Sequence, residues 1–236
     1  MIVTIDGPAG SGKSAAALLL ANRLNSPHLD TGAMYRAVAL DALERNLLGD
    51  PDAIADRARA MSLTFDWSKT PAPIHLDGRD VSETIRLPQV TEVTYEAADN
   101  PWVREELVRH QREIGRSVTT LVTEGRDQGS IVFPNAEYKF YLDAHPEERA
   151  RRRIAQLAAK GIAVEAETIL RDLVKRDTQD KTRAVGALSR PKDAIVIDTT
   201  EMSLEAVVAE MLRIIRTGKA KATAGLEMAG GKGGAP

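Results

Sequence analysis

Residues 2–14 read IVTIDGPAGSGKS, a combination of apolar run, glycine-rich turn and Gly-Lys-Ser that indicates the fold class. A short run of β-branched residues, 2–5, leads into a glycine-rich turn, which predicts a buried strand that ends near Gly7. The turn fits the pattern of a glycine, four residues and then Gly-Lys-Ser/Thr. Residues 14–24 follow as a predicted helix rich in Ala and Leu. In this strand–loop–helix context, backbone N–H groups curl around a nucleotide phosphate.

The loop therefore predicts an ATP site. Lys13 would reach the β- and γ-phosphates, and the Ser14 hydroxyl would ligate Mg²⁺. The predicted ATP-binding residues of the loop are Gly7, Pro8, Ala9, Gly10, Ser11, Gly12, Lys13 and Ser14.

The composition excludes several classes of protein. The chain has 236 residues, of which 43% are hydrophobic and 28% charged, which is typical of a globular protein with one domain or one domain plus an insertion. The net charge of −2 gives no basic field, so we expect no nucleic-acid partner. With no cysteine there is no disulfide or thiolate zinc site. No apolar stretch approaches the ~20 residues of a membrane span and no secretion signal is visible, so we expect no membrane partner and a cytoplasmic location.

Arginine is concentrated in one part of the chain. Of the 22 arginines, 13 fall between Arg104 and Arg190. The planar guanidinium fork matches phosphate oxygens bidentately, so this concentration favours a phosphate-ester site. Solvated helix faces are the alternative, although the run Arg149, Arg151, Arg152 and Arg153 cannot all point one way on a helix.

The order of the predicted elements indicates an α/β fold. Strands are predicted at residues 2–5, 63–65, 74–76, 121–123, 138–142 and 194–197, and helices at 14–24, 33–45, 51–61, 101–117, 146–160, in a stretch ending near Asp177, and at 203–216. Alternation of this kind predicts a parallel sheet flanked by helices. Prolines and the pair Asp77-Gly78 mark residues 62–92 as an inserted element. The glycine-rich residues 218–236 are expected to be a disordered tail.

A phosphate-binding loop alone leaves motors, GTPases, transporters and small kinases open. A GTPase is disfavoured because the sequence contains no Asn-Lys-x-Asp element for guanine. Three segments, residues 30–36, 124–127 and 176–183, each combine arginine with carboxylates. Any one of them alone is better explained as a surface salt bridge, but three in a chain with a phosphate-binding loop favour a kinase with a phosphorylated acceptor.

At these segments the sequence resembles the bacterial cytidylate kinases, a branch of the nucleoside monophosphate kinases, and the resemblance runs from residue 2 to about 216. It implies a single P-loop kinase domain over residues 1–217, with a monophosphate-binding insertion at 62–92 and a lid at about 149–166. It also implies that ATP, with Mg²⁺, phosphorylates CMP and dCMP to CDP and dCDP. A kinase for another nucleoside monophosphate or small metabolite is the alternative, and a nucleotide-dependent binding protein is the alternative outside the enzymes. We expect a monomer that binds only small molecules.

The resemblance also implies roles for individual residues. Thr31, Arg36, Arg126 and Arg183 would hold the acceptor phosphate, Arg176 and Asp180 the ribose, and Arg104 with Asp127 the cytosine. Asp30 and Tyr35 complete the predicted substrate site, Arg153 joins the ATP site, and the predicted catalytic residues are Lys13, Arg36, Arg126 and Arg183. An ionised Asp127 only accepts hydrogen bonds, so it would favour the amino group of cytosine over the carbonyl of uracil.

The sequence departs from the family pattern at a few positions. Ala15 stands where the family usually has a hydroxyl residue, Thr94 or Tyr95 occupies the region of a base-reading serine, and Lys181 and Ala187-Leu188 replace a small residue and a Pro-Leu pair. These departures concern ATP contacts, base recognition and lid closure rather than the reaction.

Overall fold

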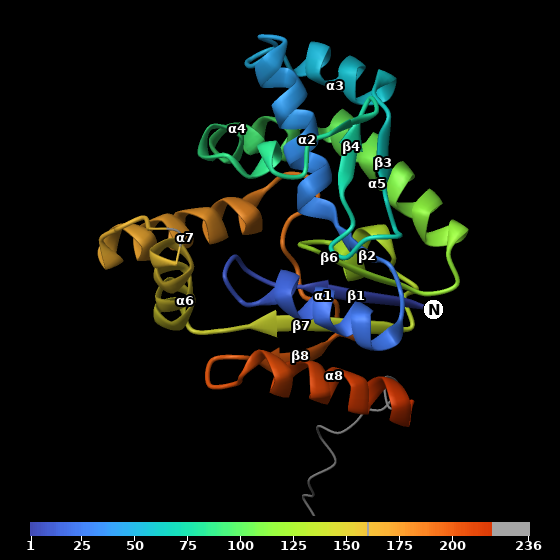
Figure 1. The fold of residues 1–236 in the computed structure, drawn as a ribbon, viewed down its shortest axis with the longest axis vertical. Coiled ribbons are helices and arrows are strands. Elements are labelled where there is room, and N and C mark those ends of the chain that lie inside the picture. The colour runs from blue at the N-terminus through green and yellow to red at the C-terminus, as the bar shows by residue number, and fades with distance from the viewer. Residues whose placement is uncertain (160, 219–236) are drawn as a thin grey trace, which may run out of the picture.

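A five-stranded parallel sheet forms the centre of the protein, whose computed structural model describes residues 1–159 and 161–218 (Figure 1). The strand order is β2-β6-β1-β7-β8, with the glycine loop following the central strand β1. The strands are β1 (Ile2–Asp6), β2 (His28–Asp30), β6 (Leu121–Gly125), β7 (Tyr138–Asp143) and β8 (Ile195–Asp198). The predicted α/β fold, a parallel sheet flanked by helices, is confirmed.

Alternation along β1 separates two faces of the sheet. Val3 and Ile5 are fully buried in one apolar cluster with residues of α1 (Lys13–Leu24) and α8 (Leu204–Thr217). Thr4 and Asp6 point to the opposite face, since successive side chains of a strand alternate. A second cluster joins residues of α2 (Thr31–Glu44), α3 (Pro51–Ala60), α4 (Pro88–Ala98) and α5 (Pro101–Ser117).

The predicted insertion forms a small antiparallel sheet of its own. It consists of β3 (Leu63–Phe65), β4 (Ile74–Leu76) and β5 (Arg79–Asp80), followed by the 3₁₀ turn η1 (Thr84–Arg86). Residue 92, the predicted end of the insertion, lies inside α4, a helix that the sequence analysis did not predict. Only Val90, Ala97 and Ala98 of α4 are buried, so its apolar pattern is too sparse to read from the sequence.

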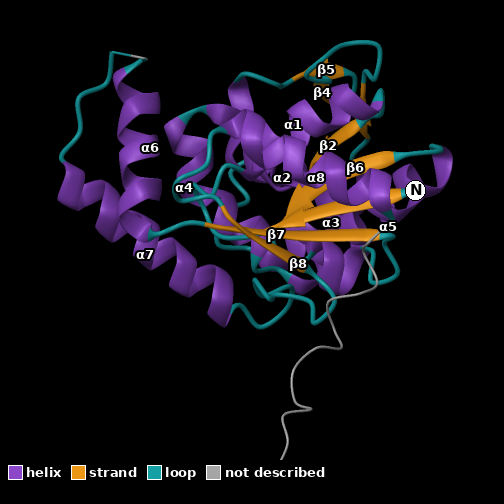
Figure 2. Cartoon of the chain, turned by 90° about the horizontal axis from the view of Figure 1, so that it is seen from below, coloured by secondary structure: helices purple, strands orange, loops and turns teal. Residues whose placement is uncertain are grey.

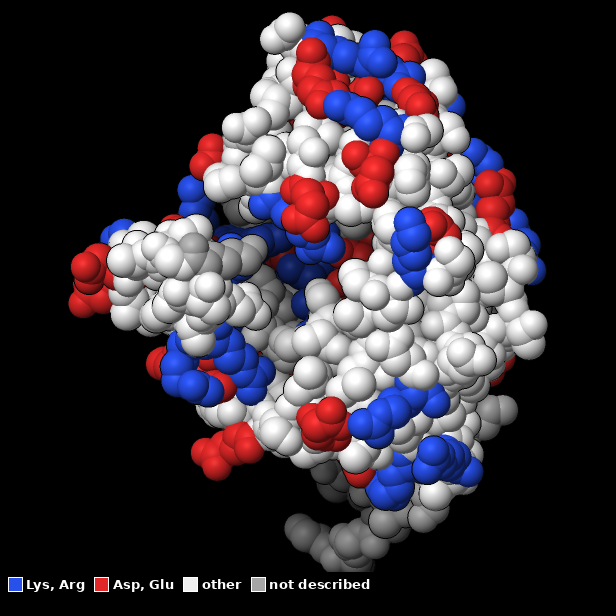
Figure 3. Space-filling model, viewed as in Figure 1, with Lys and Arg blue, Asp and Glu red and all other residues white. Residues whose placement is uncertain are grey.

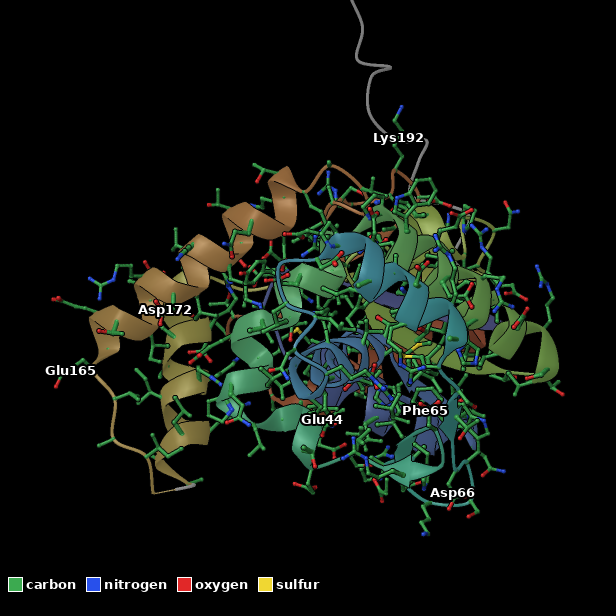
Figure 4. The ribbon with its side chains drawn as sticks, turned by 90° about the horizontal axis from the view of Figure 1, so that it is seen from above. Glu44, Phe65, Asp66, Glu165, Asp172 and Lys192 are labelled. Atoms are coloured by element: carbon green, nitrogen blue, oxygen red, sulfur yellow. The ribbon has the colours of Figure 1, made fainter. Side chains whose placement is uncertain are left out.

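Two helices, α6 (Pro146–Ala158) and α7 (Ala166–Thr182), form a hairpin that projects to one side of the sheet (Figures 1 and 2). From above, Glu165 lies at the outer end of the hairpin and Asp172 lies on α7 (Figure 4). The prediction that the second helix of the hairpin ends near Asp177 is wrong, because α7 continues to Thr182. Its final turns bury Asp177 and Asp180 through ion pairs with arginines rather than apolar side chains, so no hydrophobic period marks them.

Capping residues mark the start of α5 and the end of α8. The Asn100 side chain accepts hydrogen bonds from the backbone of Trp102 and Val103 at the start of α5. Gly218 adopts φ +66° just past α8. The predicted tail, apart from Gly218, and the predicted end of α6 at Lys160 lie outside the described residues. Within the ranges that the structure describes, no helix is long and apolar enough to cross a membrane.

Candidate active site

A cavity of about 270 Å³ opens at the carboxyl edge of the parallel sheet, where loops from several strands meet. Figure 3 shows Lys and Arg side chains gathered in a hollow between the α6–α7 hairpin and the rest of the molecule. Seven cationic and four acidic side chains line the cavity: Lys13, Arg36, Arg86, Arg104, Arg126, Arg176 and Arg183, with Asp30, Glu124, Asp127 and Asp180. This excess of positive charge suits a ligand that carries phosphate groups.

The glycine loop forms one wall of the cavity through Ala9, Gly10, Lys13 and Ser14. Gly7 adopts φ +146°, and a Cβ there would overlap the Leu142 carbonyl oxygen, so only glycine lets the loop pass this close to β7. Gly12 adopts φ +91° and is the N-cap of α1. The remaining predicted loop residues do not line the cavity; they are Gly7, Pro8, Ser11 and Gly12.

Lys13 is folded back onto the loop. Its Nζ donates a 2.8 Å hydrogen bond to the Pro8 carbonyl oxygen, and the residue is only 5% exposed. Burial and then the nearby Arg126 lower the pKa of Lys13 to about 7. Negative charge brought next to Lys13 would therefore stabilise its protonated form.

Two carboxylates at the ends of β1 and β6 flank the loop. The Ser14 Oγ donates a 2.6 Å hydrogen bond to Glu124 Oε1. Asp6 accepts hydrogen bonds from the backbone N–H groups of Gln128 and Gly129, at 2.9 and 2.7 Å. Burial raises the pKa of Asp6 to about 7 despite these two donors. Sequence reasoning gave neither carboxylate a role, although each follows a buried apolar strand.

Asp180 joins two of the predicted catalytic arginines. Arg126 Nε donates to its Oδ2 at 2.6 Å, and Arg183 Nη2 donates to its Oδ1 at 3.0 Å. Burial opposes ionisation of Asp180, but Arg126 and then Arg183 outweigh burial and lower its pKa. Arg183 also donates from Nε to Asp99 at 2.6 Å. These bonds hold both guanidinium groups in the cavity wall.

The predicted base-reading residues lie together at another part of the wall. Arg104 donates to Asp127, and its guanidinium carbon lies 5.3 Å from the ring centre of Tyr35. Burial raises the pKa of Asp127, with Arg104 opposing the shift. Thr94 lines the cavity, whereas Tyr95 is 55% exposed and donates to the neighbouring Glu96. Of these two positions in the chain, Thr94 is thus the one that faces the cavity.

The cavity wall continues along β2 and α2. Arg36 donates to Asp30 at 3.0 Å, and the Thr31 hydroxyl donates to the Glu124 carbonyl oxygen at 2.7 Å. Arg86, to which sequence reasoning gave no role, lines the cavity and lies 3.8 Å from Asp30. It comes from η1, so only the fold brings it to the site.

All ten predicted substrate-binding residues line this one cavity: Asp30, Thr31, Tyr35, Arg36, Arg104, Arg126, Asp127, Arg176, Asp180 and Arg183. Arg153, predicted to bind ATP, lies exposed on α6 and is not among the lining residues. Ala15 lines a neighbouring cavity beside α1, and Lys181 is exposed.

The oxygen donors beside the loop fit a Mg²⁺ ion held mainly by phosphates. Across residues 1–159 and 161–218 no three His, Asp or Glu side chains form a metal cage. A protein hydroxyl and a carboxylate, those of Ser14 and Glu124, lie next to each other in the cavity wall instead. Mg²⁺ prefers hard oxygen ligands and is commonly bound by one or two protein groups with substrate phosphates and water.

A glycine loop after the central strand of a parallel sheet, facing an arginine-lined cavity, defines a P-loop phosphotransferase. The sequence matches the family profile of cytidylate kinase over residues 3–217. The chain therefore belongs to the cytidylate kinase family, as the sequence resemblance predicted, and it is an enzyme that phosphorylates a nucleoside monophosphate.

Curated relatives match nearly the whole chain. The chain is 46% identical to the cytidylate kinase of Rhodopirellula baltica over 219 residues, which cover 92% of this chain and 93% of that protein. It is 44% identical to the cytidylate kinase of Carboxydothermus hydrogenoformans, covering 91% and 97%. An uncharacterised protein from Eubacterium ventriosum has a similar fold, with a TM-score of 0.52, 10% identity and coverage of 92% and 99%.

Proposed function

We propose that the enzyme transfers the γ-phosphoryl group of ATP to CMP and dCMP in the cavity described above. The observation that carries this proposal is the continuity of the cavity: the phosphate-binding loop and the ten acceptor-site residues line one space. A donor phosphate on the loop and an acceptor phosphate on the arginines would therefore be held next to each other in one site.

The loop would bind the donor phosphates. Lys13 would exchange the Pro8 carbonyl for phosphate oxygens, and its buried position strengthens that interaction because little water screens it. Ser14 and Glu124 would hold Mg²⁺, which when bound neutralises charge on the β- and γ-phosphates.

The acceptor phosphate needs positioning more than it needs a base. Its second pKa is ~6, so at pH 7 an oxygen nucleophile is already largely ionised. Arg36, Arg126 and Arg183 would draw this dianion toward the donor and offset the repulsion between the two phosphates. Asp30 and Asp180, which pair with these arginines, fix their orientation.

The cavity residues divide between ribose and base in this proposal. Arg176 and Asp180 on α7 would contact the ribose. Arg104, Asp127 and Thr94 would contact cytosine, with Tyr35 packed against Arg104. The α6–α7 hairpin, including residues 149–166, would close over the nucleotides and exclude water, which competes as an acceptor. Residues 62–92 would form the monophosphate-binding element, and the enzyme would act as a monomer.

The test is ADP release with Mg²⁺ and ATP, measured with CMP, dCMP, UMP, AMP, GMP and buffer alone. CMP and dCMP should be phosphorylated with kcat/KM at least ~10²-fold above UMP, because a polar group left unpaired in the site costs ~1 to 3 kcal/mol and a charged group such as an ionised Asp127 costs more. Purine monophosphates should be poor substrates. If UMP, AMP or GMP is a better substrate than CMP and dCMP, the enzyme is a kinase for that other nucleoside monophosphate. If no monophosphate gives more ADP than buffer alone, the protein is not a monophosphate kinase.

A further inference from the structure

Arg149, at the start of α6, is buried against the phosphate-binding loop, and the proposal above gives its side chain no contact of its own. It is 3% exposed. Its Nε donates to the Ala144 carbonyl oxygen at 3.0 Å, and its Nη1 donates to the Ala9 carbonyl oxygen at 2.9 Å. The third nitrogen, Nη2, lies 2.7 Å from Asp177 Oδ2 on α7. One guanidinium group thus joins the loop, the end of β7 and the hairpin.

Packing reinforces the same junction. Ala9 of the loop, Ala150 of α6 and Leu173 of α7 form a small apolar cluster of their own. Gly10 adopts φ +78°, and a Cβ there would lie 3.1 Å from the Arg149 Cβ, so the loop lies directly against α6. The loop and the hairpin therefore share both a polar and an apolar contact.

The same helix carries acceptor-site residues. Arg176 and Asp180 line the cavity, and Asp177 lies between them in sequence on the side that meets Arg149. Asp177 is itself buried, and its Oδ1 has no hydrogen-bond partner among the described residues. A change in the position of α7 must therefore act on Arg149, because Arg149 is the group that holds Asp177 in place.

The bond from Arg149 to Ala9 also fixes a peptide plane of the loop. In a trans peptide the C=O and the following N–H point to opposite sides. Holding the Ala9 carbonyl toward Arg149 consequently turns the Gly10 N–H away from Arg149, and Gly10 lines the cavity. Lys13 holds the preceding carbonyl, that of Pro8.

We propose that Arg149 is a positioning residue that sets the conformation of the phosphate-binding loop and, through Asp177, couples it to the acceptor-site helix α7. This inference rests on the proposed function for the identity of the acceptor. Binding of CMP to Arg176 and Asp180 would steady α7, hold Asp177 against Arg149, and present the loop ready for ATP. ATP and CMP would then each raise the affinity of the enzyme for the other.

The experiment measures the affinity of the full-length enzyme for the β,γ-imido analogue of ATP, with Mg²⁺, in the absence and presence of saturating CMP. The variants are Arg149→Lys, which keeps the charge but loses the three-way fork, and Asp177→Asn, which keeps the shape. Arg213→Gln on α8, whose partner is the exposed Glu210, is the matched surface control. Circular dichroism and Tm show whether each variant is folded at the assay temperature.

In the parent and in Arg213→Gln, CMP should tighten binding of the analogue at least ~5-fold, within the usual range of coupling between sites. Arg149→Lys should weaken analogue binding at least ~10-fold even without CMP, because three charge-assisted contacts become one. Asp177→Asn should bind the analogue within ~3-fold of the parent without CMP but lose most of the tightening.

Parental affinity in folded Arg149→Lys would overturn the positioning role, and so would tightening by CMP that survives in Asp177→Asn. Absence of tightening in the parent overturns the coupling. Turnover of CMP by the parent is measured in the same samples. Since the arm without CMP does not depend on the acceptor, a failure of CMP as substrate is distinguishable from a failure of the Arg149 inference.

Discussion

Arg104 donates a hydrogen bond from Nη2 to Asp127 Oδ2 inside the cavity wall, and the two side chains are 4% and 6% exposed. Arg104 is held further by a 3.2 Å bond from Nη1 to the Ala98 carbonyl oxygen. A Cβ at Gly186, which adopts φ +72°, would overlap the same guanidinium. Four parts of the chain thus fix an anion and a cation side by side where the base is proposed to bind.

The first prediction concerns the choice of base. Asp127→Asn keeps the shape of the side chain but adds a donor that uracil accepts, so the ratio of kcat/KM for CMP over UMP should fall at least ~10-fold. Asparagine is preferable to alanine because it leaves Arg104 a polar partner, whereas removing one member of a buried pair is strongly destabilising. If both substrates lose activity in equal proportion, Asp127 supports Arg104 without reading the base.

The second prediction concerns the loop lysine. Lys13→Ala should lower kcat at least ~10³-fold while the far-UV spectrum stays parental, because Lys13 contacts one loop carbonyl and contributes charge rather than apolar packing. Steady-state kinetics with CMP at saturating ATP measure the fall in kcat, and circular dichroism measures whether the fold is unchanged. Turnover near that of the parent would remove Lys13 from the catalytic residues.

The third prediction separates the two partners of Arg183. Arg183→Ala should raise KM for CMP or lower kcat by more than ~10-fold, because it removes a charge-assisted contact worth ~1.5 to 3 kcal/mol and leaves Asp180 with one partner fewer. Asp99→Ala is the matched control: Asp99 also pairs with Arg183 but is half exposed and is not among the lining residues. This control should change either constant less than ~3-fold. Equal losses in the two variants would assign Arg183 to docking of α7.

The sequence was sufficient for four of the five strands of the parallel sheet, for the loop and for the residues that local rules govern, but it did not predict the short edge strand β2. The phosphate-binding pattern occupies only eight consecutive residues, 7–14, and the Asn100-Pro101 helix start occupies two. The predicted acceptor site rests on three short segments that each join arginine to a carboxylate, and their predicted residues line one cavity. Two of the segments begin at the end of a strand, and the third spaces Arg176, Asp180 and Arg183 three or four residues apart at the end of α7, so these members stay together after folding.

The site residues that the sequence did not reveal are placed by contacts between residues far apart in the chain. Arg86 reaches the cavity from η1 only because the small sheet folds back toward β2, and Asp177 is buried only because Arg149 faces it from α6. Neither contact has a local signature, since residues 28 or more positions apart make it. The run Arg149, Arg151, Arg152 and Arg153 divides in the same way: the first is buried, the second pairs with Glu148, the third bonds to Thr199, and the fourth is exposed.

The fourth prediction tests the carboxylate that sequence reasoning missed. Glu124→Gln keeps an acceptor for the Ser14 hydroxyl but removes the negative charge, so the Mg²⁺ concentration for half-maximal activity should rise at least ~5-fold. KM for CMP should stay within ~2-fold, because Glu124 is proposed to hold the metal and not the acceptor. A parental Mg²⁺ requirement would place the metal elsewhere.

The last prediction follows from the pKa of about 7 for Lys13. At pH 7 in the free enzyme about half of the Lys13 side chains are protonated, by the definition of the pKa. Phosphate oxygens favour the charged form and raise this pKa, so ATP binding should take up about half a proton at pH 7 and more at pH 8. Asp6, whose pKa is also about 7, lies buried near the loop, and added negative charge raises its pKa too, which adds uptake of the same sign.

Calorimetric titration with the β,γ-imido analogue in buffers of different ionisation enthalpy measures the number of protons. Lys13→Arg, which stays charged throughout, should lower the uptake, and the part that remains should vanish on adding Asp6→Asn. Proton release on binding, or uptake unchanged in Lys13→Arg, would contradict the assignment of a neutral fraction to Lys13.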